Sequence, residues 1–325
     1  MPPSAMTPRM APKSTGSVFS LSLYMFFALM VVVFSSMSRT FLTFSNIYGT
    51  ILNGAPLVLI TCAINFALLA GTLDLSVAAV GYASGCVCGI MLRNLQSPLW
   101  MAICAGLGVA TVVGLINSLL IVKLKMNAFL TTLGMMLAIR GVGKIVTQDR
   151  TILMGKVLAD IRHMKIGSLG GFPVLLFVVA AVVLVSQLVL SFTRFGRHVV
   201  AVGCDERAAR NLGIDVPRVR TLALVTTSFI CGIGGVVWVI TLGSVITRGL
   251  NGYEFLAIAA AVLGGTSLFG GRGAFFPGAL IGALILLFIA DGLTIVGVSP
   301  YTMPFVRGAI LFAAMYVDSL RVRFT

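Results

Sequence analysis

The chain has 325 residues, of which 58% are hydrophobic and 10% are charged, and its mean hydropathy is +1.08. A soluble domain of this length does not tolerate such a composition, so soluble enzymes and soluble binding modules are excluded and a polytopic membrane protein is expected. The net charge of +14 would suggest a nucleic-acid partner in a soluble protein, but in a membrane protein it reports topology, so no nucleic acid is expected.

The sequence divides into about ten apolar blocks, and each transmembrane helix needs ~20 apolar residues. The blocks are 18–37, 47–69, 76–92, 99–122, 128–146, 172–192, 221–246, 256–268, 274–296 and 303–317. We therefore expect an all-α protein with about ten transmembrane helices and a membrane domain over residues 18–320. Residues 1–17, rich in Pro, Ser and Met, are expected to form a disordered cytoplasmic tail, and residues 321–325 a second cytoplasmic tail.

The distribution of Lys and Arg predicts the orientation, because these residues accumulate on the cytoplasmic side. With a cytoplasmic N-terminus and ten alternating spans, thirteen of them lie inside and seven outside, four of the seven in the loop 148–167. This bias predicts that both termini are cytoplasmic.

The first acidic residue within the membrane domain is Asp74, in the stretch GTLDLS at 71–76. A charged side chain at bilayer depth costs ~2.5–3.5 kcal/mol, so it requires a partner or a water-filled path. Gly71 and Thr72 weaken the helix before it, which is consistent with a discontinuous helix beside a pathway. The alternative is a short cytoplasmic turn in which Asp74 caps the third span. The two interpretations are compatible.

Further charges lie in or near the later spans. Arg140 and Lys144 sit one turn apart on the fifth span and either face a polar pathway or extend to the outer interface to bind lipid headgroups. Glu254 begins the eighth segment and either lines an outer mouth or caps a helix. Asp291 and Arg307 are expected to pair across a helix interface.

Glycines at a spacing of four predict close helix packing. Gly81, Gly85 and Gly89 share one face of the third span, and Gly278 and Gly282 share a face of the ninth. The glycine-rich stretch 264–273 cannot form a stable helix, so it predicts a tight bend.

The segment 193–220 is too polar to enter a bilayer. It holds six of the 23 Lys and Arg and three of the nine acids, and a loop this polar favours a soluble partner. Asp205 and Glu206 lead into the run Arg207-Ala208-Ala209-Arg210, which Gly213 ends, so a capped cytoplasmic helix is expected.

Signs of catalysis are absent from the sequence. No stretch matches the phosphate-binding pattern GxxxxGK[ST], so ATP hydrolysis by this chain is not expected. The two histidines, His163 and His198, lie in loops, and the six cysteines lie mostly inside spans, so neither a membrane enzyme, a metal site nor a disulfide is expected.

Three stretches together resemble the permease subunits of bacterial ABC sugar importers of the ribose type, a family that includes xylose, arabinose and galactose permeases and is related to branched-chain amino acid permeases. The first is LDLSV at 73–77, similar to the family's GGIDLSVG; the second is NAFLTTLGMM at 127–136 with Arg140-Gly141, similar to PAFIxTLGMMxxxRG. The third runs from Phe195-Gly196-Arg197 through Gly213-Ile214 to Gly252-Tyr253-Glu254 and GGTSL at 264–268. The match covers nearly all of the chain beyond its N-terminal tail.

The resemblance implies a type II ABC importer-like permease in the bacterial inner membrane, surrounded by lipid and working as a dimer with a second copy or a sibling permease. It implies two ATP-binding subunits beneath, which carry ATP and Mg, and a periplasmic sugar-binding protein above. The charged loop would then be the coupling helix, and its contacts with the ATPase are assigned to Asp205, Glu206, Ala208, Ala209, Asn211, Gly213 and Ile214. The translocation pathway is assigned to Asp74, Ser76, Phe129, Thr132, Met135, Arg140 and Glu254.

The sequence departs from the family pattern at several positions. Ala78 follows Leu-Ser-Val where the family has Gly, Thr72 replaces a Gly, and Asn127 stands where Pro is common. These changes put ribose itself in doubt as the substrate. An importer of branched-chain amino acids or nucleosides would share the architecture, whereas an ion-coupled secondary transporter would need midplane acids and would leave the charged loop without a role.

Overall fold

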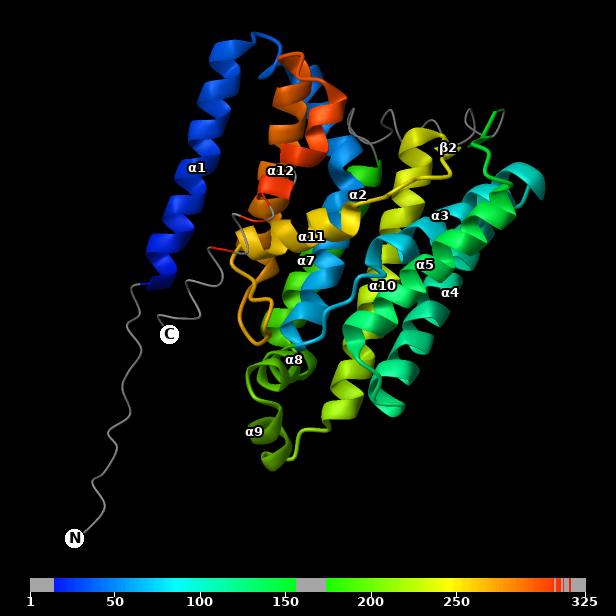
Figure 1. Cartoon of the computed structure of the whole chain (residues 1–325), viewed down its shortest axis with the longest axis vertical. Coiled ribbons are helices and arrows are strands. Elements are labelled where there is room, and N and C mark those ends of the chain that lie inside the picture. Colours follow the sequence, from blue (N-terminus) through cyan, green and yellow to red (C-terminus); the bar gives the residue numbers. More distant parts are fainter. Residues whose placement is uncertain (1–14, 156–173, 307, 311, 313–315, 317–325) are drawn as a thin grey trace.

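The computed structural model describes residues 15–155, 174–306, 308–310, 312 and 316, and these residues form a helical bundle (Figure 1). The N-terminal half contains α1 (Thr15–Met37), α2 (Phe44–Leu69), α3 (Val77–Asn94), α4 (Leu99–Ser118) and α5 (Ala128–Thr147). The C-terminal half contains α7 (Val174–Phe192), α8 (Arg194–Cys204), α9 (Glu206–Asn211), α10 (Val216–Leu242), α11 (Tyr253–Leu263) and α12 (Leu280–Ile295). π-Helical turns at Leu119–Lys123 and Phe275–Ala279 extend α4 and precede α12, and Pro300–Thr302 forms a 3-10 turn.

Seven helices within the described ranges are long and apolar enough to cross a membrane, and two apolar helices are shorter. The all-α polytopic class is therefore confirmed, whereas the count of ten and the cytoplasmic termini stay predictions. The block 256–268 is one of the short ones, because α11 has 11 residues. At 1.5 Å per residue it extends about 16 Å, half of the ~30 Å hydrocarbon core. The block 303–317 lies only partly within the described residues.

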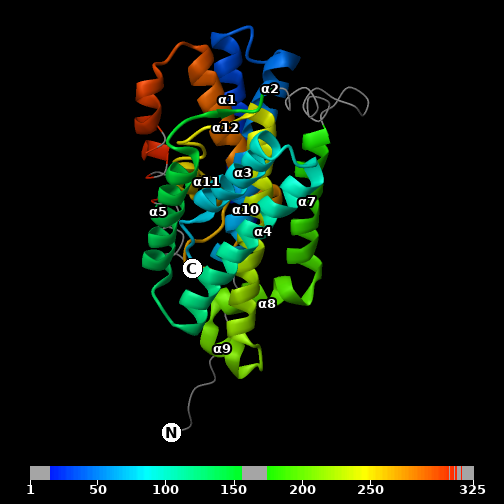
Figure 2. The same cartoon turned by 90° about the vertical axis from the view of Figure 1, so that its right-hand side faces the viewer.

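The core of the bundle is the pair α2 and α10, which pack against each other and against α3, while α4 packs on α10 and α3. Residues Gly54–Leu69 of α2 are all buried, so this helix has no face left for lipid in its second half. Figures 1 and 2 show α4 and α5 on one side of this core and α1 and α12 on the other. The outlying α1 is attached by an aromatic cluster, in which the rings of Phe27 and Phe41 lie 5.9 and 6.0 Å from the ring of Phe288.

The predicted glycine packing is confirmed, and the structure supplies the partners. The glycine face of α3 lies on α10, where a Cβ on Gly81 would be 3.0 Å from the carbonyl oxygen of Cys231 and a Cβ on Gly85 2.7 Å from that of Gly235. Gly278 and Gly282 lie in the same way against the backbone of Gly264 and Ala260. Close backbone contact therefore holds the centre of the bundle.

The two ends of the bundle differ in structure. At one end stand α8 and α9, and at the other the start of α2 and a short antiparallel pair of β1 (Ile152–Leu153) and β2 (Ser244–Val245) (Figure 1). The charged segment 193–220 lies at the first end and contains α8, α9 and the first turn of α10. The sequence predicted the helix that follows Asp205, which is α9, but not α8.

Gly235→Ala is expected to destabilise the protein by about 1–3 kcal/mol, because the new Cβ has no room beside the Gly81 carbonyl and the two helices must separate. Gly108→Ala on α4 is the control, since nothing lies within 4 Å of its Cβ and Ala is the better helix former. Thermal unfolding in detergent measures both variants. Equal melting temperatures would contradict the packing at Gly235.

Candidate functional site

The break between α2 and α3 is buried rather than exposed to the cytoplasm. Gly71 turns the chain with a φ of +71°, and Asp74 follows with no exposed surface. Its Oδ1 accepts hydrogen bonds from the backbone nitrogen of Ser76 at 2.8 Å and from the Ser76 hydroxyl at 2.6 Å. Asp74 therefore stabilises the turn before α3 from inside the protein, although the N-cap of α3 is Ser76. A position of Asp74 beside a pathway stays a prediction.

Polar groups from two further helices join Asp74. The Ser76 hydroxyl accepts a hydrogen bond from Asn117 Nδ2 of α4 at 2.9 Å, and the backbone nitrogen of Leu75 donates to Thr132 Oγ1 of α5 at 3.1 Å. We call Asp74, Ser76, Asn117 and Thr132 the Asp74 cluster, and all four are fully buried. Asp74 Oδ2 and Asn117 Oδ1 have no hydrogen-bond partner within the described residues. Buried polar atoms are rarely left unpaired, so the cluster has capacity for water or a ligand hydroxyl.

A second buried polar group lies further along α5. Arg140 is turned inward, with its Nη2 3.4 Å from Glu254 Oε2, and the two side chains are 17% and 3% exposed. Arg140 also donates to the carbonyl oxygens of Gly249 and Leu250 at 3.3 and 3.1 Å. Extension of Arg140 to the outer interface does not occur in this structure, whereas Lys144 is exposed.

The pathway residues assigned from the sequence thus form two groups along α5. Asp74, Ser76 and Thr132 belong to the first, and Arg140 and Glu254 form the second. Met135 is partly buried between them, whereas Phe129 is 46% exposed and belongs to neither group.

Sequence reasoning missed Asn117 and the partner of Asp291. Asn117 is an amide within an apolar block, and that alone was the available signal. Asp291 Oδ2 accepts a hydrogen bond of 2.7 Å from Asn46 Nδ2 of α2. The expected partner, Arg307, lies outside the described residues.

At the other candidate site, α8 is attached closely to the membrane part. The ring of Phe195 stacks on Phe66 of α2 at 6.4 Å, and Gly203 lies against the carbonyl oxygen of Leu69. The Cys204 thiol donates to the carbonyl oxygen of Gly271 at 3.2 Å. The backbone nitrogen of Gly271 donates to the carbonyl oxygen of Leu69 at 3.1 Å. We call this contact of α8, the end of α2 and the loop 264–273 the glycine junction.

The cap predicted for α9 is present, and the structure adds ion pairs that were not predicted. Asp205 Oδ1 accepts from the backbone nitrogens of Arg207 and Ala208 at 2.8 and 3.0 Å. Glu206 pairs with Arg210 at 2.7 Å and with Arg220 of α10 at 2.8 Å. The hydrogen bond from Arg210 holds the pKa of Glu206 below its ordinary value, and the charge of Arg220 acts in the same direction.

The seven residues assigned to an ATPase contact do not share one surface. Ala209 is buried against the chain itself and Ile214 is half-buried, so these two attach α9 to the bundle. The exposed residues are Asp205, Arg207, Ala208, Arg210, Asn211, Leu212 and Gly213, and Glu206 is half-buried. Leu212 was not singled out from the sequence, yet it is 80% exposed, and an apolar side chain so exposed in this polar segment is a candidate contact for a protein partner.

Metal ions have no evident site in the described part of the chain. No group of three or more His, Cys, Asp or Glu side chains is close enough there to hold one. The six cysteines are all free of disulfides.

Curated relatives match the chain over nearly its whole length. The ribose import permease protein RbsC of Escherichia coli (strain K12) is 31% identical over 89% of this chain and 90% of its own. The L-arabinose transport system permease protein AraH of the same strain is 32% identical over 95% of this chain and 94% of its own. The D-allose transport system permease protein AlsC of that strain is 33% identical over 90% of this chain and 89% of its own.

No solved structure matches the chain significantly. The family model described as "Branched-chain amino acid transport system / permease component" matches residues 46–315. This range includes the Asp74 cluster, the Arg140–Glu254 pair, the glycine junction and α9. The chain therefore belongs to this family of transport permeases.

Proposed function

We propose that this chain is the membrane-spanning permease subunit of an ATP-driven monosaccharide importer in the bacterial inner membrane. ATP and Mg would be bound by ATP-binding subunits that dock on α9, and a periplasmic sugar-binding protein would deliver substrate to the opposite end. A second copy or a sibling permease would complete the dimer. Relatives named for ribose, arabinose and allose favour a monosaccharide.

The observation that carries the proposal is the geometry of α9. This short helix stands at one end of the molecule, beyond the apolar helices (Figure 1). It is capped by Asp205, anchored by the buried Ala209, and exposes Ala208 and Leu212. A polar segment held in this way has the features of a docking element rather than of a disordered loop.

The glycine junction suggests how docking would act on transport. A displacement of α9 is carried by α8 to the carbonyl oxygen of Leu69, the last residue of α2. The break at Gly71 follows directly, and then the Asp74 cluster. A rigid-body movement of α8 would therefore shift the polar contacts that Asp74 makes with α4 and α5.

An importer of branched-chain amino acids is the second candidate, because the description of the family model names these substrates. The ribose, arabinose and allose permeases favour a sugar instead. The two candidates share the same partners and differ in the ligand of the binding protein.

Affinity purification of the tagged protein in mild detergent, followed by mass spectrometry and an ATPase assay, tests the proposal. We expect a nucleotide-binding subunit in the eluate and stimulation of its activity by a periplasmic binding protein, whose ligand then identifies the substrate. A chain that purifies alone and moves solute into liposomes without ATP would instead be a secondary transporter.

Leu212→Asp is expected to reduce co-purification of the ATPase and sugar uptake at least tenfold, because it places a charge on the proposed docking surface. The melting temperature of the permease should not change, since the side chain is 80% exposed and contributes little to folding. Leu95→Asp is the control, a 66% exposed leucine in the loop between α3 and α4, and it should retain the ATPase. Normal co-purification of Leu212→Asp would rule out α9 as the docking element.

Asp74→Asn separates a pathway role from a capping role. Asn keeps an acceptor for the nitrogen and hydroxyl of Ser76, so folding should be nearly unchanged, whereas a carboxylate that contacts substrate predicts at least a tenfold loss of uptake. The matched control is Asp215→Asn, an exposed cap of α10 that accepts from the Arg218 nitrogen at 3.1 Å. Uptake near the wild-type level in both variants would leave Asp74 with a capping role only.

A further inference from the structure

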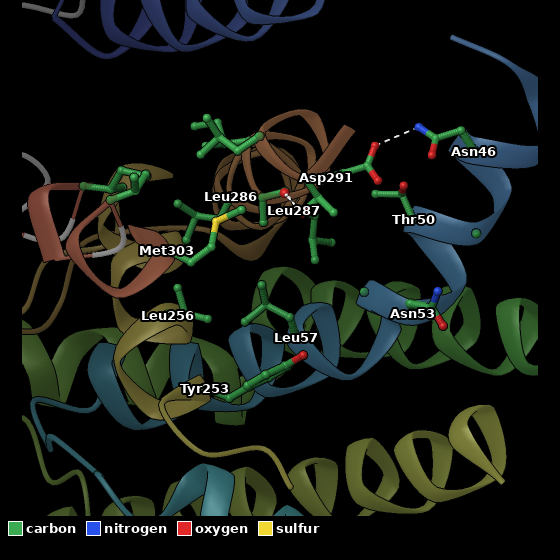
Figure 3. A pocket seen from close by; sticks show the side chains of 18 of the residues that line it. Asn46, Thr50, Asn53, Leu57, Tyr253, Leu256, Leu286, Leu287, Asp291 and Met303 are labelled. Carbon is green, nitrogen blue, oxygen red and sulfur yellow. Dashed lines mark hydrogen bonds between the residues drawn. The ribbon is translucent and has the colours of Figure 1, made fainter. Parts of the chain in front are cut away.

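A cavity of about 540 Å³ lies between α2, α11 and α12, with Met303, Val306 and Ile310 along one side (Figure 3). Its volume falls within the range of about 300–1,000 Å³ that is typical of small-molecule sites. It is separate from the Asp74 cluster, and none of the pathway residues assigned from the sequence lines it. Its lining includes the first turns of α2, from Ser45 to Asn53. Figure 1 shows that α2 begins at the end of the bundle opposite α9.

One wall of the cavity is polar. Asn46, Thr50 and Asn53 follow each other at steps of four and three residues, so they share one face of α2. Figure 3 shows this row of side chains along α2, with Asp291 of α12 beside its first members. Asn46 donates to one oxygen of Asp291 at 2.7 Å, which orients the carboxylate, and a carboxylate can accept further hydrogen bonds on its other oxygen.

These polar side chains are not explained by packing alone. Asn53 is exposed although it lies within a helix that is apolar enough to cross the membrane. The buried hydroxyl of Thr50 has no hydrogen-bond partner within the described residues. Polar groups at membrane depth usually mark a substrate path, because without a partner they raise the free energy of the protein.

The facing wall is apolar and carries one aromatic ring. Leu57, Leu256 and Met303 line it, and Tyr253 closes one side with its ring, as Figure 3 shows. A monosaccharide has the matching surfaces, because its hydroxyls project from the ring edge while its C–H groups form apolar faces that pack against aromatic and aliphatic side chains. Apolar walls with a few convergent polar groups are typical of small-molecule sites.

The charges of the cavity favour a neutral ligand. Asp291 is the one acid, and no Lys or Arg occurs, among the described residues that line it. A free amino acid carries a carboxylate that would find no cationic partner among these residues, and transfer of an unpaired charge from water is costly. A polyol carries no charge, and its hydroxyls can donate to Asp291 and accept from the amide of Asn53. The amide of Asn46 already donates to the Phe41 carbonyl oxygen and to Asp291, so its role is to orient the carboxylate.

We propose that this cavity binds one monosaccharide on its way through the permease, with Asn53 and Asp291 as hydrogen-bonding residues and Tyr253 as the stacking surface. The proposal rests on the proposed function. The first turn of α11 separates the cavity from the Arg140–Glu254 pair, because Tyr253 faces the cavity and Glu254 faces Arg140. A ligand in the cavity would therefore contact the same turn of α11 that carries Glu254 of the ion pair.

Cysteine protection tests the binding directly. Asn53→Cys, in a background in which the two exposed native cysteines are removed by Cys104→Ser and Cys204→Ser, is labelled with a small maleimide in the assembled transporter. Ribose, arabinose and allose are added in turn at millimolar concentration without the binding protein, so that a docked protein cannot cause the protection. We expect the transported sugar to slow labelling at least threefold. Asn94→Cys, exposed at the end of α3 and outside the cavity, should label at an unchanged rate.

Transport kinetics provide the second readout. Asn53→Leu should raise the KM for uptake at least tenfold while the melting temperature stays at the wild-type level. Thr50→Val should weaken uptake more than Thr111→Val, a control threonine on α4 whose hydroxyl already donates to the Leu107 carbonyl at 2.8 Å.

The outcomes distinguish this proposal from the function on which it rests. A wild-type transporter that moves neither these three sugars nor any other monosaccharide contradicts the proposed function, and the sugar in the cavity with it. A transporter that moves one of them normally, while this sugar leaves Asn53→Cys labelling and Asn53→Leu kinetics unchanged, overturns the cavity alone.

Discussion

The arrangement of this protein depends on one backbone contact, the glycine junction. There is no space for a side chain at Gly203, since a Cβ would overlap the carbonyl oxygen of Leu69 and lie 2.6 Å from the nitrogen of Gly271. Gly270 and Gly271 adopt φ values of +97° and +69°, which glycine reaches without strain. Three chain segments can therefore meet at hydrogen-bonding distance, and α8 cannot move without moving the end of α2 or the loop before α12.

Polar contacts hold α5 in its place in the bundle. Only 28% of the 18-residue apolar stretch of α5 is buried, so packing alone attaches this helix weakly to the bundle. It is held instead by Thr132, which accepts from the Leu75 nitrogen, and by Arg140, which binds two carbonyl oxygens and Glu254. A buried ion pair is costly to desolvate and contributes little net stability, but its removal would leave a buried charge without a partner. The position of α5 therefore depends on the α2–α3 break at one end of the helix and on the first turn of α11 at the other.

The sequence predicted the features that depend on local pattern. Composition identified the membrane class, and the spacing of Gly81, Gly85 and Gly89 identified a packing face. The same reasoning could not find partners distant in sequence, because no local pattern relates Arg140 to Glu254, 114 residues away, or Asn46 to Asp291, 245 residues away. It also counted the short block 256–268 among the ten apolar blocks without placing its end, since hydropathy does not show where a helix ends, and Gly264 and Gly265 end α11 after 11 residues. It placed Ala209 on the docking surface, whereas the structure buries this side chain. Which side of α9 is buried depends on tertiary contacts that the local sequence does not show.

The helix α2 connects the two regions to which function is assigned. Its first part carries the polar row from Asn46 to Asn53, and its second part, from Gly54 onward, is fully buried and ends at the glycine junction. Pro56 lies just after the boundary and provides no backbone N–H for the helical hydrogen bond to Leu52, so the helix is least constrained by its own backbone where the two parts meet. A displacement of Leu69 by α8 therefore acts on the same helix that forms the polar wall of the cavity. A ligand that fixes Asn53 and Asp291 would favour one position of the first part of α2. Where this part and the buried second part move together, ligand binding and docking at α9 are coupled in both directions.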